Sequence, residues 1–208
     1  MTMKFKNIKF ALLFLVITSF LISCYISKPL AVEVRVSVNT NFPVVIKNES
    51  NSNFVNKHTE ADYRTAYVNE LMKELAFNHI VVDNASPEFL VEIASLYLTE
   101  STKLDTVKDV KSKDNGIVRE LTLAGLKTHG TVMKTSDRSI HKWEADKDKN
   151  ESLTNNRSLE QIIEGKNKDN TVYREKAFSD DEFITQSGVC GRRAAVRIAH
   201  EIGKMLKK

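Results

Sequence analysis

Hydrophobic and polar residues alternate most clearly in residues 31–38, AVEVRVSV. Valine occupies every second position there, and polar side chains fall between the valines for most of the stretch. A period of two is typical of a β-strand with one buried face. Val44-Val45-Ile46 follows a break at Pro43, so we expect this segment either to continue the strand or to pair with it.

A repeat of four residues follows and predicts an amphipathic helix from about residue 59 to residue 78. Its large apolar side chains form a stripe that we expect to face the core; they are Tyr63, Tyr67, Leu71 and Leu75. Thr59 and Asp62 have the spacing of a capping box at the start of such a helix. Asn78 is the expected left-handed residue at its end.

Several strands are predicted next, at residues 80–82, 88–100, 116–134 and 140–145. The segment 88–100 is ambiguous between helix and strand, and its aliphatic and aromatic content after a turn favours a strand. Gly125 indicates a possible bulge in the following strand. Trp143 is expected to anchor the last of these strands to the core.

Two further helices are predicted in the last third of the chain. Ser158 and Gln161 suggest a capping box for a short helix that stops at Gly165, after a polar loop at 146–158. Ser179 with Glu182 suggests the cap of a final helix. Its apolar stripe runs through Ala195, Ile198, Ala199, Ile202, Met205 and Leu206.

Gly188 and Gly191 are expected to break the final helix into two pieces. The order of strand, helix, several strands and helix predicts an α+β fold, a two-layer sandwich. We expect a mostly antiparallel sheet with two long helices on one face. Residues 31–208 would form this single domain.

The N-terminal residues are typical of an export signal. Lys4, Lys6 and Lys9 precede an uncharged run from Phe10 to Ile22, and a basic head with a short apolar core has this role. A retained membrane anchor is the alternative, because counting on to Ile26 brings the run close to the ~20 apolar residues of a spanning helix.

The end of this run, Leu21-Ile22-Ser23-Cys24, resembles the lipobox of bacterial prolipoproteins. The resemblance implies that residues 1–23 are removed as a signal peptide and that Cys24 is fatty-acylated. Residues 24–30 would then be a tether to the membrane. Two or three acyl chains hold a protein firmly at a bilayer.

Most of the net positive charge of the chain lies in the predicted signal. The whole chain carries 31 basic and 27 acidic residues, a net charge of +4, but three of the lysines lie in the signal, which has no acid. The mature chain therefore has a net charge of +1, which excludes the strong basic excess of a nucleic-acid binder. With Cys24 acylated, Cys190 has no partner for a disulfide.

The sequence contains no complete metal-binding motif. Residues 146–157, DKDKNESLTNNR, begin like a calcium loop, but Glu151 stands in place of the glycine and Arg157 in place of the closing glutamate. His129 and His141 could face each other across a hairpin, although histidines that meet solvent on strands are commoner. We expect no metal and no cofactor.

Catalytic motifs are also missing, because no Ser-His-Asp signature or phosphate-binding glycine loop is present. Cys190 is either a nucleophile or a small buried residue at a helix start, and the second interpretation is favoured. The acids in 179–182 are explained by capping and the helix dipole. The basic residues near the C-terminus could contact anionic lipid headgroups, although a solvated face is favoured; they are Arg192, Arg193, Arg197, Lys204, Lys207 and Lys208.

In its order of elements the chain resembles small α/β-sandwich lipoproteins of the Gram-negative outer membrane, such as the lipopolysaccharide-transport accessory lipoprotein. The resemblance carries over no functional residue, because a fold does not determine a function. The predicted anchor, together with the absence of a catalytic constellation, predicts a lipid-anchored, non-catalytic envelope protein that binds or scaffolds an envelope complex; the alternative is a carrier or sensor of lipid or glycolipid. Tyr25, in place of the aspartate linked to inner-membrane retention, favours the outer membrane. The sequence leaves open the face of that membrane, the partner and the oligomeric state.

Overall fold

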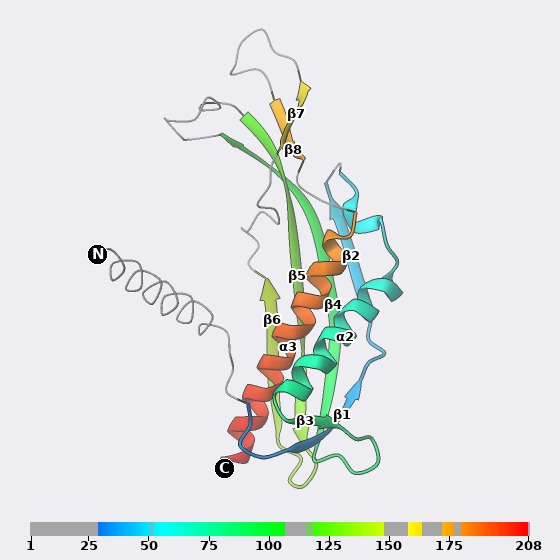
Figure 1. The fold of residues 1–208 in the computed structure, drawn as a ribbon, viewed down its shortest axis with the longest axis vertical. Helices are drawn as coiled ribbons and strands as arrows, with labels where there is room; N and C mark the ends of the chain where they lie inside the picture. The colour runs from blue at the N-terminus through cyan, green and yellow to red at the C-terminus, as the bar shows by residue number, and fades with distance from the viewer. Residues whose placement is uncertain are drawn as a thin grey trace, which may run out of the picture.

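Two long helices lie side by side against one face of a twisted β-sheet (Figure 1). The computed structural model describes residues 29–50, 52–106, 116, 118–147, 158–163, 172–176 and 180–207. Its strands are β1 (Val34–Asn39), β2 (Val44–Glu49), β3 (Ile80–Val82), β4 (Phe89–Thr106), β5 (Val118–Lys134), β6 (Ile140–Lys147), β7 (Ser158–Ile163) and β8 (Val172–Lys176). The helices are the 3-10 turn η1 (Phe54–Asn56), α2 (Glu60–Phe77) and α3 (Glu182–Leu206). The expected α+β two-layer sandwich is confirmed.

The sheet is mixed. Its longest pairings, β4 with β5 and β5 with β6, are antiparallel, whereas β1 and β2 both run parallel to β4. Residues 36–39 of β1 lie opposite 89–92, and residues 44–49 of β2 lie opposite 96–101. The two strands therefore follow one another along the same edge of β4, and the break at Pro43 interrupts one line of pairing.

Helix α2 begins as its sequence predicts. The Thr59 side chain accepts a hydrogen bond from the Asp62 N–H at 3.2 Å, and the Asp62 carboxylate accepts one from the Thr59 N–H at 2.9 Å. The hydrogen bonds from the Thr59 side chain and backbone hold the pKa of Asp62 below its usual value. The four residues of the predicted stripe are all fully buried, which confirms that this face packs on the core.

The end of α2 differs from the prediction by one residue. Asn78 has φ −85°, and its side-chain amide donates to the Glu74 carbonyl at 2.8 Å, so it stays on the right-handed side of the backbone map. The left-handed residue is His79, with φ 61°. Because the Asn78 side chain is hydrogen-bonded to a helix carbonyl, the left-handed turn that ends the helix falls one residue later, at His79.

Strand β4 confirms the strand interpretation of residues 88–100, but the bulge is not at Gly125. The pairing of β4 with β5 shifts between Ile93 and Ser95, close to Gly130. A Cβ atom at Gly130 would lie 1.9 Å from the Glu92 carbonyl oxygen and 2.6 Å from the Trp143 ring. Trp143, with 4% of its surface exposed, is the predicted core anchor and packs over this glycine.

The short helix predicted from Ser158 and Gln161 to Gly165 is wrong. Residues 158–163 form β7, which pairs antiparallel with β8. A helix of about two turns is unstable on its own, whereas a strand here has a neighbour to pair with. The sequence pattern of a cap does not reveal that neighbour.

Helix α3 is one continuous helix, so the predicted break at the glycines is also wrong. A Cβ atom at Gly191 would lie 2.1 Å from the carbonyl oxygen of Tyr67, and one at Gly188 would lie 3.1 Å from the Glu70 side chain. The glycines allow α2 and α3 to approach closely. The N-cap is Asp181, without a side-chain capping bond, and Ser179 lies outside the described residues.

The predicted stripe of α3 is buried along most of its length, from Ala195 to Met205, whereas Leu206 is 43% exposed. Within the described ranges, no helix is both long and apolar enough to cross a membrane.

Candidate functional site

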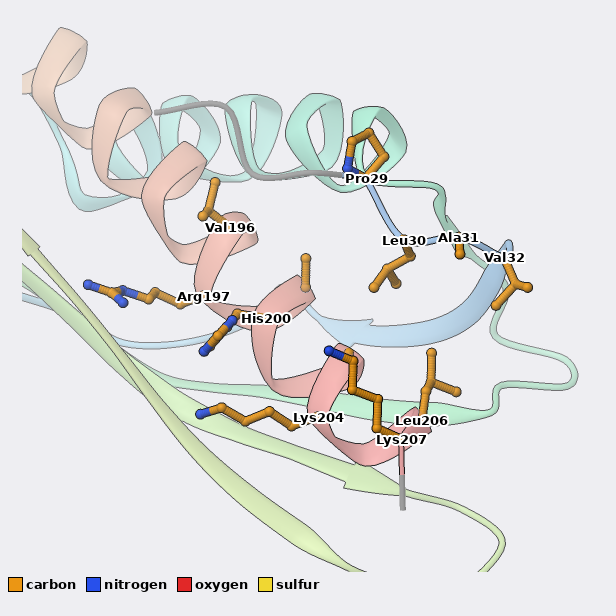
Figure 2. Close-up of a pocket in the computed structure, with 12 residues that line it drawn as sticks. Pro29, Leu30, Ala31, Val32, Val196, Arg197, His200, Lys204, Leu206 and Lys207 are labelled. Atoms are coloured by element: carbon orange, nitrogen blue, oxygen red, sulfur yellow. The ribbon is translucent and has the colours of Figure 1, made fainter. Parts of the chain in front are cut away.

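A groove opens where the N-terminal segment meets the last turns of α3 (Figure 2). Its volume is about 610 Å³. One wall is formed by residues 29–32, and the other is formed by α3. The apolar residues of the α3 wall are Val196, Ala199, Gly203 and Leu206. The lining is therefore largely apolar.

The N-terminal wall is held in place by the end of α2. The Leu30 N–H donates to the Asn78 carbonyl at 3.3 Å, and the Val34 N–H donates to the His79 carbonyl at 3.0 Å. The left-handed backbone of His79 also allows its ring Nδ1 to donate to the Leu30 carbonyl at 2.8 Å. Residues 29–34 are thus hydrogen-bonded to the domain, and they include Pro29 and Leu30, the last two residues of the predicted tether 24–30.

The Leu30 side chain points from the N-terminal segment toward α3 (Figure 2), where Gly203 lies next to it. A Cβ atom at Gly203 would lie 3.5 Å from Leu30 Cδ2, which is an ordinary contact distance. The sequence gives no sign of this meeting, because the two residues are far apart in the chain and neither belongs to a recognisable motif.

The rim of the groove is basic. Its cations lie along α3 at Arg197, Lys204 and Lys207, with His200 between them, and the described lining contains no carboxylate. Arg197, His200 and Lys204 point to the side of α3 away from residues 29–32 (Figure 2). Arg197, Lys204 and Lys207 all line the groove, but their side chains do not converge on one point (Figure 2). Arg192 instead pairs with Glu70, and Arg193 donates to the Asp146 carbonyl.

Glu201 fixes one of these cations from behind the rim. Its carboxylate contacts Lys204 Nζ at 2.7 Å and His141 Nδ1 at 2.9 Å, and its side chain is 15% exposed. Burial raises the pKa of Glu201, but the hydrogen bonds from Lys204 and His141 outweigh burial and leave the pKa below its usual value.

Glu201→Gln is expected to lower the free energy of unfolding by about 1 kcal/mol at pH 7. Because the folded pKa is depressed, the stabilisation is present above the unfolded value and is lost as pH falls through the folded one. The difference from the wild type should therefore shrink between about pH 5 and pH 3. Urea unfolding at each pH measures it, with the exposed Glu33→Gln as control. A difference independent of pH would contradict the ion-pair account.

Cys190 is a buried core residue nine positions into α3, 1% exposed. Burial raises the pKa of its thiol to about 12. A nucleophilic cysteine needs an accessible thiolate, so the interpretation as a small buried residue is confirmed, although not at a helix start. Cys24 lies outside the described residues.

The histidines that could have faced each other do not. His129 lies opposite Glu144 and His141 lies opposite Val132 in the pairing of β5 with β6. His129 instead stacks on Tyr97, with ring centroids 6.1 Å apart. No group of three metal-ligating side chains gathers in the part of the chain that the structure describes. Residues 148–157 of the calcium-like loop lie outside that part.

The acids at the start of α3 have structural partners. Asp181 lies 3.1 Å from His58 Nε2, and Asp180 lies 3.7 Å from Lys57 Nζ. These contacts join the start of α3 to the turn before α2. Asp181 is the N-cap residue but makes no side-chain capping bond, so side-chain capping does not explain its place.

No protein-family model and no curated protein matches the chain. Among solved structures, it is similar to a homolog of a neuraminyllactose-binding hemagglutinin from Helicobacter pylori, with 10% identity over 87% of this chain and 89% of that one and a TM-score of 0.42. It is also similar to a PelC dodecamer subunit from Paraburkholderia phytofirmans, with 9% identity over 81% of this chain and 95% of that one and a TM-score of 0.29. At these values neither similarity transfers a ligand or an assembly to this chain.

Proposed function

We propose that the chain is a lipid-anchored, non-catalytic protein of the bacterial outer membrane that binds or scaffolds an envelope complex. The observation that carries the proposal is the place where the chain enters the fold. Residues 29–33 and 203–207 lie together at one end of the molecule, which we call the base (Figure 1). Pro29 is five positions after Cys24 in the sequence, so the anchor would lie within about 18 Å of the base.

The long strands run away from this base. β4 has 18 residues, a span of about 60 Å. Its first residues pair with β1 near the base, and its other end projects beyond the two helices (Figure 1). Leu104, near the projecting end, is 61% exposed. An anchor at Cys24 would thus hold the base at the membrane and present the far end to a partner.

Anchoring itself would supply much of the binding advantage. A lipid anchor confines the domain to the membrane surface and raises its effective concentration for partners held there. We therefore expect the tagged full chain to recover a reproducible envelope complex from crosslinked cells. Cys24→Ser should recover much less of it, and Leu104→Asp tests whether the far end is the contact. Equal recovery by Cys24→Ser would count against the scaffold.

Cys24→Ser is expected to abolish labelling by a palmitate analogue and to shift the protein from the membrane to the soluble fraction. The reason is that Cys24 would carry the acyl chains and residues 1–23 would be removed. Gel fluorescence and membrane flotation measure the two effects.

Cys190→Ser is the matched control for this change and should label like the wild type. Equal labelling of Cys24→Ser and wild type would contradict the lipoprotein hypothesis. A chain that is unlabelled yet remains with the membrane, at its uncleaved mass, would support the retained transmembrane anchor instead.

A second candidate function, a carrier or sensor of lipid or glycolipid, is favoured by the groove. Its volume of about 610 Å³ lies in the range of ligand sites, and such sites combine an apolar lining with a few placed polar groups. Native mass spectrometry of the purified full chain without any bound lipid would remove this candidate.

A further inference from the structure

We propose that the groove binds one anionic phospholipid of the membrane that carries the anchor. An acyl chain would lie against the apolar walls, and the phosphate would lie at the rim beside Lys207, because the Lys204 side chain points away from residues 29–32 (Figure 2). The inference rests on the proposed function, because the anchor is what would hold the base at that membrane. It adds a specific lipid contact to non-specific tethering.

The apolar part of the site is open at its mouth. Val32 is 57% exposed and Leu206 is 43% exposed, one from each wall of the groove. Apolar side chains gathered on a concave surface are typical of a site that an apolar ligand covers. Moving an acyl chain from a bilayer into this groove exchanges one apolar environment for another, so the transfer carries little hydrophobic cost.

The site is also preformed. Leu30 is held by hydrogen bonds from its backbone N–H to Asn78 and from the His79 ring to its carbonyl. Gly203, facing Leu30, contributes no side chain to fill the space between the walls. A ligand therefore does not have to order the wall before it binds.

The charges of the rim select the headgroup. The described lining has three cations and no carboxylate. Arg197 and Lys204 point away from residues 29–32, so Lys207 is the cation placed to meet a phosphate there (Figure 2). Lys204 is shared with Glu201, whereas the structure shows no ion pair for Arg197 or Lys207 among the described residues. Basic residues next to a membrane surface favour anionic over neutral lipid, so a phosphate that is not balanced by choline is the expected partner.

The experiment uses the full-length lipidated chain in phosphatidylcholine vesicles doped with phosphatidylglycerol that carries a diazirine on one acyl chain. After illumination, mass spectrometry of peptides locates the crosslinks. We expect them in residues 29–32 and 196–206. The same diazirine on phosphatidylcholine should give about tenfold fewer.

Two variants test the two halves of the site. Gly203→Leu places a side chain in the apolar space and should lower crosslinking about tenfold, whereas Gly203→Ala should lower it little. Lys207→Glu should lower crosslinking to phosphatidylglycerol about tenfold and leave crosslinking to phosphatidylcholine unchanged. Lys103→Glu, on the exposed far end of β4, is the matched charge control. Circular dichroism checks that each variant folds.

Three results would overturn the proposal. One is the absence of groove crosslinks, and another is equal crosslinking by both lipids with no effect of Lys207→Glu. The third is crosslinking in the groove of the unlipidated Cys24→Ser variant but not of the wild type, which would mean that the protein's own acyl chain fills the groove. Flotation of the same samples separates the hypotheses: a chain that floats without crosslinking refutes the lipid site and leaves the anchor standing.

Discussion

Gly191→Ala is expected to destabilise the protein by about 3 kcal/mol, the upper end of what overpacking a core usually costs. The added Cβ would lie 2.1 Å from the Tyr67 carbonyl oxygen and 2.9 Å from its carbonyl carbon. Both are backbone atoms of α2, so no side-chain rotation relieves the contact. The two helices must separate, and the buried faces that meet between them lose packing. Urea unfolding measures the change.

Gly203→Ala is the matched control in the same helix and should have the opposite sign. Its Cβ would meet nothing closer than Leu30 Cδ2 at 3.5 Å, and alanine favours a helix over glycine by up to about 1 kcal/mol. Gly188→Ala should fall between the two, because its nearest neighbour is the flexible Glu70 side chain at 3.1 Å. Near-equal stability of Gly191→Ala and wild type would contradict the close approach of α2 and α3.

The same glycines show where sequence reasoning stops. Gly188 and Gly191 weaken a helix by propensity, so the pattern alone indicates a break. In the structure they face the backbone of α2, and the tight packing that they allow outweighs the propensity. A helical glycine can break its helix or allow another helix to approach closely. Which of the two occurs depends on a partner far along the chain, about 120 residues away for Gly191 and Tyr67.

Sequence patterns that depend on near neighbours predict this structure better than patterns that depend on distant ones. The Thr59 cap and the apolar stripe of α2 depend on residues within a few turns, and both are as predicted. The parallel pairing of β1 and β2 with β4, and the pairing that makes 158–163 a strand, depend on neighbours that periodicity does not specify.

The candidate groove was only half visible in the sequence. The sequence indicates the basic residues of the last helix, but not the wall formed by residues 29–32. That wall depends on His79, whose left-handed backbone turns its ring onto Leu30. A left-handed histidine has no sequence signature, and asparagine adopts this conformation more readily, so the sequence favours the neighbouring Asn78. The groove therefore depends on the meeting of residues 29–32 with α3, which no local sequence pattern specifies.

Tyr67→Ala is expected to lower the free energy of unfolding by about 4 kcal/mol, as for large aromatic side chains removed from a core. Tyr67 is fully buried, and its ring meets Phe42 edge-on with centroids 5.2 Å apart. Its hydroxyl lies 3.2 Å from Thr128 Oγ1, which itself donates to the Ser95 carbonyl at 3.0 Å. The hydroxyl proton of Thr128 is thereby used, so Tyr67 is the donor to Thr128.

Tyr67→Phe separates the ring from the hydroxyl and should cost only about 1 kcal/mol. The ring packing is kept, and Thr128 keeps its bond to Ser95. Burial raises the pKa of Tyr67, so the hydroxyl stays protonated in the folded state and the cost should be the same at pH 6 and pH 9. A cost that changes across this range would mean that another group titrates with the pair.

The effects of the changes at Gly191 and Tyr67 are expected to be coupled. The added Cβ at position 191 contacts the backbone of residue 67, so the contact is also present in Tyr67→Ala. In Gly191→Ala, the forced separation of α2 from α3 sacrifices part of the packing around the Tyr67 ring. Once the ring is gone, that packing cannot be lost again, so the double variant should be less destabilised than the sum of the single variants. Strict additivity in urea unfolding would show that the helices accommodate Gly191→Ala without moving the Tyr67 ring.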